Sequence, residues 1–198
     1  MGNLLSVSKA LAACGARAEV LEAPRDLSEF SGIVLPGVGA FADAATALRG
    51  SGWVGEISRS AAAARPLLGI CLGMQLLLSS STEDGEHEGL GLIPGRVVRL
   101  ASRPGFHVPH MGWNQLRFPR PCPLFRGIPE GEHVYFVHSY YPVPDDPADV
   151  IATTDYGGEI PVALQRGSLY GVQFHPEKSQ AVGLRILRNF IDLTREKA

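Results

Sequence analysis

The chain has 198 residues, 45% of them hydrophobic, so it is long enough to bury the core of one domain spanning residues 1–198. Its net charge of −2 and the lack of any Lys/Arg-rich run argue against a nucleic-acid partner. No apolar stretch reaches the roughly 20 residues of a membrane span, and three cysteines without framework spacing favour a reducing compartment. We therefore expect a cytoplasmic protein that does not bind a membrane.

The first half of the chain alternates helical and strand-like segments. Apolar residues at helical spacing predict helices over 3–16, 42–48, 53–64 and 72–78. Short β-rich runs predict strands over 18–21, 32–35 and 66–70. The run over 66–70 has no polar alternation, as in a strand buried on both faces. This alternation predicts an α/β fold with a mostly parallel central sheet flanked by helices.

Strand-like segments separated by Gly/Pro turns dominate the second half. They cover 97–100, 108–116, 134–141, 150–153, 162–165 and 169–174. The helical period returns over 180–194. We therefore expect an additional antiparallel β region beside the parallel sheet.

Cys71 is the candidate nucleophile, because Gly69-Ile70-Cys71-Leu72-Gly73 joins an apolar strand to a helix. The string has the form of a G-x-S-x-G nucleophile elbow with cysteine in place of serine. The elbow places the sulfur at a helix N-terminus, where the positive end of the helix dipole favours a thiolate, and aims the Leu72 N–H at an oxyanion. A lone cysteine is more often a small buried apolar residue. We interpret Cys14 and Cys122 in that way.

His175-Pro176-Glu177 follows an apolar strand and supplies a candidate base and its orienting carboxylate. The carboxyl ends of the strands hold the active sites of α/β sheets, so this segment and Cys71 are expected at one edge. A metal site is a weaker alternative. The other histidines, namely His87, His107, His110, His133 and His138, lack ligand spacing.

On these residues the sequence resembles the class I, triad-type glutamine amidotransferases, which are flavodoxin-like. Within them it is similar to the glutaminase subunits of imidazole glycerol phosphate synthase. The resemblance covers nearly the whole chain. The matching strings are 35–41 (LPGVGAF), 69–75 (GICLGMQ), 89–95 (GLGLIPG), 109–114 (PHMGWN), 137–141 (VHSYY) and 173–179 (QFHPEKS).

The resemblance implies the role of each candidate residue. Cys71, His175 and Glu177 would form the catalytic triad, and Gly37, Val38, Gly39 and Leu72 the oxyanion hole. Gln75, Glu83, Ser139 and Tyr140 would bind L-glutamine. Asn3, Trp113, Asn114 and Lys178 would lie toward a partner subunit. Without the resemblance, Glu83 would be interpreted as a solvated acid, Trp113 as a core residue and Lys178 as a solvated charge.

The resemblance also implies a reaction and a partner. The chain would hydrolyse glutamine without a cofactor and pass ammonia to a (βα)₈ cyclase subunit in a heterodimer of histidine biosynthesis. Two alternatives remain open: the glutaminase of another pathway, such as pyridoxal phosphate or anthranilate synthesis, and a non-catalytic glutamine-binding or scaffold subunit. One departure is expected to matter for the fold. Family members begin with a strand and a turn that have no counterpart before Asn3.

Overall fold

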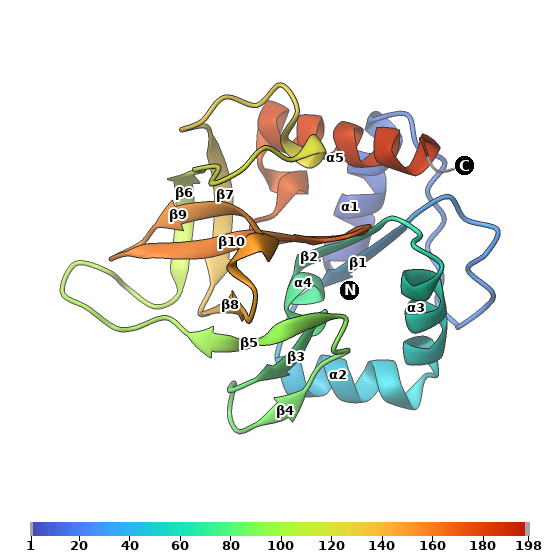
Figure 1. The fold of residues 1–198 in the computed structure, drawn as a ribbon, viewed down its shortest axis with the longest axis horizontal. Helices are drawn as coiled ribbons and strands as arrows, with labels where there is room; N and C mark the ends of the chain where they lie inside the picture. Colours follow the sequence, from blue (N-terminus) through green and yellow to red (C-terminus); the bar gives the residue numbers. More distant parts are fainter. Residues whose placement is uncertain (1, 197–198) are drawn as a thin grey trace.

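Helices and strands form one mixed α/β structure in the computed structural model, which describes residues 2–196, with side chains from Leu4 onward (Figure 1). The helices are α1 (Gly2–Ala13), α2 (Phe41–Gly50), α3 (Trp53–Ala62), α4 (Leu72–Leu76) and α5 (Gln180–Arg195), with 3-10 turns η1 (Pro123–Phe125), η2 (Pro147–Asp149) and η3 (Pro176–Lys178). The strands are β1 (Ile33–Gly37), β2 (Leu67–Cys71), β3 (Leu78–Ser81), β4 (His87–Glu88), β5 (Ile93–Arg99), β6 (His110–Gln115), β7 (His133–His138), β8 (Tyr140–Pro144), β9 (Val150–Asp155), β10 (Glu159–Arg166) and β11 (Leu169–Val172).

The central sheet has the strand order β1-β2-β11-β10-β9. Strands β1, β2 and β11 run parallel, and β10 and β9 extend the sheet in antiparallel fashion. The α/β class with parallel strands between helices is thus confirmed, and the structure adds an antiparallel edge. The remaining strands form a four-stranded sheet, β4-β3-β5-β8, and the β6-β7 pair. These two sheets form the expected additional β region, which is antiparallel except that β3 and β5 pair in parallel.

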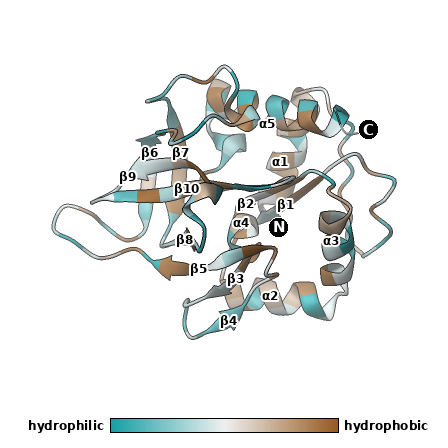
Figure 2. Cartoon of the chain, viewed as in Figure 1, coloured by the Kyte–Doolittle hydropathy of each residue, from teal (hydrophilic) through white to brown (hydrophobic). Residues whose placement is uncertain are grey.

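Strand β2 carries the core on both of its faces. Leu68 and Ile70 pack with buried residues of α1 and α5, whereas Leu67 packs with those of α2, α3 and α4. Successive side chains of a strand point to opposite faces, so a strand between two helical layers is apolar throughout. Helix α5 pairs a hydrophobic stripe with hydrophilic residues, as Figure 2 shows.

Three predicted elements were wrong in detail. Residues 18–21 form no strand, and Val20 is exposed. The predicted helix over 72–78 ends at Leu76, and Leu78 begins β3. The predicted strand over 134–141 is two strands, because β7 pairs with β6 whereas β8 pairs with β5. Strands are defined by their neighbours, so local β propensity cannot place them.

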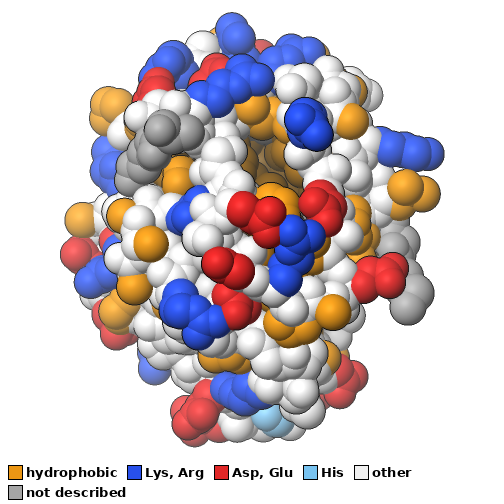
Figure 3. All heavy atoms as spheres, turned by 90° about the vertical axis from the view of Figure 1, so that its right-hand side faces the viewer, with side chains coloured by type: hydrophobic (Ala, Val, Ile, Leu, Met, Phe, Trp, Pro, Cys, Tyr) orange, Lys and Arg blue, Asp and Glu red, His pale blue; other side chains and the backbone are white. Residues whose placement is uncertain are grey.

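Strand β1 forms one edge of the central sheet. Within residues 2–196, strand β1 pairs with β2 on one side, and no strand pairs with its other edge. Helix α1 packs against β1. The face of the molecule near α3 and the C-terminus has a hollow that exposes hydrophobic side chains among charges of both signs (Figure 3). Mixed charge of this kind differs from the basic stripe of a nucleic-acid-binding surface.

Candidate active site

Cys71 lies at a sharp turn between β2 and α4. Its backbone has φ of +55° and ψ of −114°, an unusual conformation for a residue with a side chain. Flanking glycines make this turn sterically possible. A Cβ on Gly73 would lie 1.7 Å from the Leu35 carbonyl oxygen, and a Cβ on Gly69 would lie 2.6 Å from Met74 Cα. The predicted elbow is therefore present, and the packing around it explains both glycines.

His175 and Glu177 are held by the segment that leads from β11 into η3. The His175 backbone N–H donates to the Tyr135 carbonyl over 2.9 Å, and the Ser179 hydroxyl donates to the His175 carbonyl over 2.7 Å. These bonds tie the segment to β7 and to the start of α5. His175 Nδ1 then lies 2.8 Å from Glu177 Oε1, with both side chains essentially closed to solvent.

The electrostatics of His175 favour its charged form. Burial alone would lower the pKa of its imidazole, but hydrogen bonds with Cys71 and Glu177, and the negative charges of both partners, outweigh burial and raise the pKa to about 9. With Nδ1 bonded to Glu177, the other ring nitrogen is left for the sulfur. The sequence placed these three residues at one edge of the sheet, and the structure brings them into one line, with Cys71 and His175 at a cavity wall and Glu177 hydrogen-bonded to His175.

A cavity of about 350 Å³ opens beside this line, within the range of small-molecule sites. Its lining comprises Val38, Gly39, Cys71, Leu72, Gln75, Glu83, Pro109, Val137, His138, Ser139, Tyr140 and His175. Seven of the residues expected in the oxyanion hole or the glutamine site thus join Cys71 and His175 at one cavity. Gly37, the last residue of β1, pairs with Cys71 and is absent from this wall.

Two of these residues, Gln75 and Glu83, also form hydrogen bonds within the protein. Gln75 donates to the Tyr140 carbonyl over 3.1 Å and to the Gln173 side chain over 2.9 Å. Glu83 Oε2 accepts a 2.7 Å hydrogen bond from the Phe41 N–H at the start of α2. That helix has no side-chain cap at Ala40, so Glu83 supplies the missing acceptor.

Two of the four residues expected at a partner surface, Trp113 and Lys178, lie against Tyr135. Trp113 is 47% exposed and meets the Tyr135 ring edge-on, and the Lys178 ammonium lies 5.8 Å from the centre of that ring. Met111, also exposed, precedes Trp113 on the same face of β6. Asn114 points elsewhere and donates to the Asp155 carbonyl. Asn3 belongs to α1, but its side chain lies outside the described residues.

Sequence reasoning missed three buried polar residues beside the cavity. His138 and Gln173 are buried near Cys71, and His110 is buried behind them, with 3.0 Å between His110 Nδ1 and His138 Nε2. Desolvation lowers the pKa of His110 to about 4 and that of His138 to about 3. The spacing of Gln173 two residues before His175 was an available signal, since alternate residues of an extended segment share a face.

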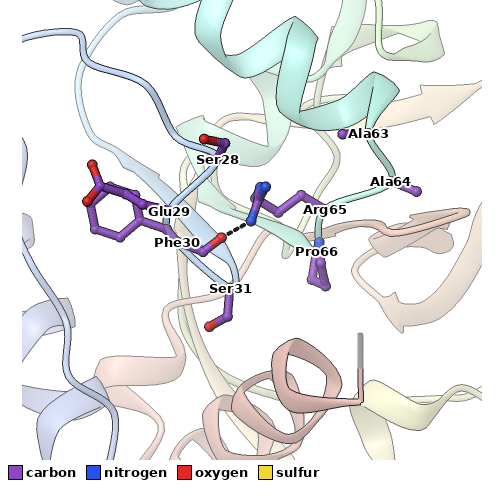
Figure 4. Close-up of a pocket in the computed structure, with 8 residues that line it drawn as sticks. All are labelled: Ser28, Glu29, Phe30, Ser31, Ala63, Ala64, Arg65 and Pro66. Carbon is purple, nitrogen blue, oxygen red and sulfur yellow. Dashed lines mark hydrogen bonds between the residues drawn. The ribbon is translucent and has the colours of Figure 1, made fainter. Parts of the chain in front are cut away.

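A second hollow, of about 430 Å³, lies at the opposite end of β2 (Figure 4). Arg65 in its wall donates to the Phe30 carbonyl, and Ser28, Ser31 and Pro66 complete much of the lining. It contains no cysteine or histidine, so it offers no nucleophile–base pair. Within the part of the chain that the structure describes, no cluster of His, Cys, Asp or Glu could hold a metal. Nor is any described helix long and apolar enough to cross a membrane.

Comparison with known proteins identifies the family of the chain. Residues 2–193 match the family model "Glutamine amidotransferase class-I". The chain is 56% identical over 195 residues to the imidazole glycerol phosphate synthase subunit HisH of Moorella thermoacetica, covering 98% of this chain and 92% of that protein. It is 51% identical over 201 residues to the HisH subunit of Syntrophotalea carbinolica, covering 98% and 96%.

Solved structures agree on the fold. A crystal structure of a glutamine amidotransferase superposes with a TM-score of 0.74 at 22% identity, covering 98% of this chain and 95% of that chain. The PurLQS structure from Thermotoga maritima also gives a TM-score of 0.74, at 19% identity and 96% and 92% coverage. The elbow, the buried His–Glu pair and these matches together show that the chain belongs to the class I glutamine amidotransferase family, among the relatives of the HisH subunits.

Proposed function

We propose that this chain is the glutaminase subunit of imidazole glycerol phosphate synthase and works in the cytoplasm in histidine biosynthesis. The observation that carries the proposal is the line from Cys71 through His175 to Glu177 at the wall of the 350 Å³ cavity. The high identity to HisH subunits over nearly the whole chain supports the choice of pathway.

The triad geometry supports a two-step hydrolysis of L-glutamine. The Cys71 thiolate attacks the side-chain amide carbon, a C–S bond forms, and the protonated His175 gives its proton to the departing ammonia. Water then attacks the glutamyl thioester while His175 takes its proton, and the C–S bond breaks to release glutamate and regenerate the thiolate. Glu177 keeps the imidazole in the tautomer that leaves Nε2 free and stabilises its charged form.

The cavity wall provides for the oxyanion and for the substrate's charges. The Leu72 N–H follows the nucleophile, and Val38 and Gly39 line the same cavity, so their N–H groups are the proposed oxyanion donors. Gly39 has a φ of +101°, a conformation that glycine adopts easily, which favours a peptide able to reorient. Glu83 would hold the α-ammonium, and Gln75, Ser139 and Tyr140 would bind the rest of the glutamine.

Ammonia would pass to a (βα)₈ cyclase subunit bound in a heterodimer. The exposed apolar residues Met111 and Trp113 and the neighbouring Lys178 are the proposed contact surface. Trp113 is a side chain of the kind that anchors protein interfaces. A glutaminase of another pathway would use the same triad with a different partner, and a non-catalytic glutamine-binding subunit would not need the triad at all.

Glutamate release by the Cys71→Ala variant, assayed together with the cyclase, tests the proposal. We expect hydrolysis to be lost while glutamine still binds, because the thiol is one part of a larger pocket. Synthase activity with ammonium salts in place of glutamine should persist. Cys14→Ala is the matched control, because that thiol donates to the Leu184 carbonyl and lies outside the cavity wall. Hydrolysis at the parent rate in Cys71→Ala would refute the proposal, and co-purification identifies the partner.

A further inference from the structure

Gln173 is a fully buried amide next to the nucleophile. Its side-chain nitrogen lies 3.7 Å from Cys71 Sγ, within hydrogen-bonding range of sulfur. The proposed mechanism gives this residue no task. An apolar side chain would occupy such a buried position at lower desolvation cost, so the amide calls for an explanation.

The orientation of this amide follows from its neighbours. The Tyr140 carbonyl can only accept, so the Gln75 group 3.1 Å from it must be the NH₂. That same NH₂ lies 2.9 Å from the Gln173 side chain, which must therefore present its carbonyl oxygen to Gln75. The NH₂ of Gln173 is left facing the sulfur. Flipping either amide would oppose two donors or two acceptors inside the protein.

The Tyr140 carbonyl also accepts a hydrogen bond from His138, which belongs to a second chain of hydrogen bonds. His138 Nδ1 donates to this carbonyl over 2.9 Å, so the neutral His138 ring accepts at Nε2 from His110 Nδ1 over 3.0 Å. His110 Nε2 then faces the Asn114 NH₂ at 3.4 Å. Desolvation keeps the pKa values of both histidines low, so both rings stay neutral and this donor order persists near neutral pH.

We propose that Gln173 is a positioning residue for Cys71: its side-chain N–H stabilises the thiolate and holds the sulfur at the cavity wall, oriented by Gln75 and the Tyr140 carbonyl. The inference rests on the proposed function, in which that thiolate is the nucleophile. An N–H bonds more strongly to an anion than to a neutral thiol, so the donor shifts the equilibrium toward the reactive form. It complements His175, which also receives and returns protons.

Replacing Gln173 by methionine tests the role of the N–H at similar side-chain size. The readout is the pH dependence of Cys71 alkylation by iodoacetamide, quantified on the Cys71 peptide because the chain has three cysteines. Because the variant loses a hydrogen bond to a charged group, we expect the midpoint of Cys71 alkylation to rise by about one pH unit. Below that midpoint the variant should contain about tenfold less thiolate than the parent. Glutamine hydrolysis should fall by the same factor at low pH and recover above the new midpoint.

Gln165→Met is the matched control. Gln165 also lies beside a cysteine, accepting from Cys122 Sγ at 3.4 Å, but it lies on β10, outside the cavity wall. It should leave the Cys71 midpoint unchanged. If Gln173→Met lowers thermal stability and its Cys71 midpoint equals that of the parent, Gln173 is a packing residue and the inference is wrong.

A measurement on the parent protein guards against a Gln173→Met variant that does not fold. The side-chain ¹⁵N–H resonances of Gln173 should shift with pH at the same midpoint as Cys71 alkylation. Resonances that do not shift over this pH range would overturn the inference. The proposed function fails by a different result, namely hydrolysis that survives Cys71→Ala. The two ideas are therefore separable.

Discussion

The imidazole of His175 and the carboxylate of Glu177 meet at 2.8 Å with side-chain exposures of 2% and 0%. Pro176 separates the two residues in sequence and restricts the backbone between them. Oε2 of the carboxylate has no hydrogen-bond partner among the described residues. The carboxylate thus directs its interaction to one ring nitrogen and leaves the other for Cys71.

Glu177→Gln should lower the turnover of glutamine hydrolysis by about 10²–10⁴-fold, the range of general acid–base catalysis. The amide lacks the charge that helps raise the pKa of His175, and if it donates to Nδ1 the ring carries its proton on the wrong nitrogen. Steady-state kinetics over pH 6–9 in the active complex measure the effect. Glu132→Gln, on a residue outside the cavity wall, is the control, and equal rates in both variants would contradict the assigned role.

Gly73→Ala should destabilise the fold and abolish hydrolysis, because the new Cβ would lie 1.7 Å from the Leu35 carbonyl oxygen. Relief requires β1 and the elbow to separate, and overpacking typically costs about 1–3 kcal/mol or more. Thermal unfolding measures the change. Gly50→Ala is the matched control, since its Cβ would meet nothing within 4 Å. A Gly73→Ala protein as stable as Gly50→Ala would contradict a tight contact between residue 73 and the Leu35 carbonyl.

The His110–His138 pair predicts acid sensitivity. Both rings are neutral in the fold down to pKa values of about 4 for His110 and 3 for His138, whereas the unfolded chain protonates them near the ordinary histidine pKa of 6.5. The unfolded state therefore binds more protons as pH falls below 6.5. Each ring then lowers the free energy of unfolding by up to about 1.4 kcal/mol per pH unit, until the pH reaches its pKa in the folded state.

Urea unfolding between pH 7 and pH 4 tests this slope. A His110→Gln, His138→Gln double variant should lose stability less steeply with acid than the parent does. The exposed His133, on the same strand as His138, provides His133→Gln as the control, which should keep the parent slope. An unchanged slope in the double variant would assign the acid sensitivity to other groups.

The isolated chain should hydrolyse glutamine slowly, because the Val38–Gly39 peptide at the cavity rim can present either its carbonyl or its N–H to Cys71. One oxyanion donor contributes about 3–4 kcal/mol, which corresponds to about 10²–10³-fold in rate. Activity should rise by at least that factor when the cyclase and its nucleotide ligand are both bound. Glutamate release from the chain alone, with cyclase, and with cyclase plus ligand measures the rise. Equal rates in all three would rule out this switch.

Local patterns predicted the elements that short-range forces decide. The strand–Cys71–helix turn and the His-Pro-Glu segment were predictable because glycines permit the sharp turn and a proline restricts the backbone, both within a few residues. The absence of a strand over 18–21 was not predictable. Residues with β propensity form a strand only where a neighbouring strand pairs with them, and none pairs with this run in the described chain. The split of 134–141 into β7 and β8 also depends on distant partners, β6 and β5.

The sequence by itself determined the family, the alternating α/β order and the identity of the Cys71, His175 and Glu177 candidates, because these depend on residue type and spacing along the chain. The tertiary structure alone decided which residues share the cavity. It brought Glu83 to the start of α2 and joined Gln173, Gln75 and His138 around the Tyr140 carbonyl. Hydrogen bonds between residues up to a hundred positions apart exist only once the sheets have paired, so no local pattern encodes them.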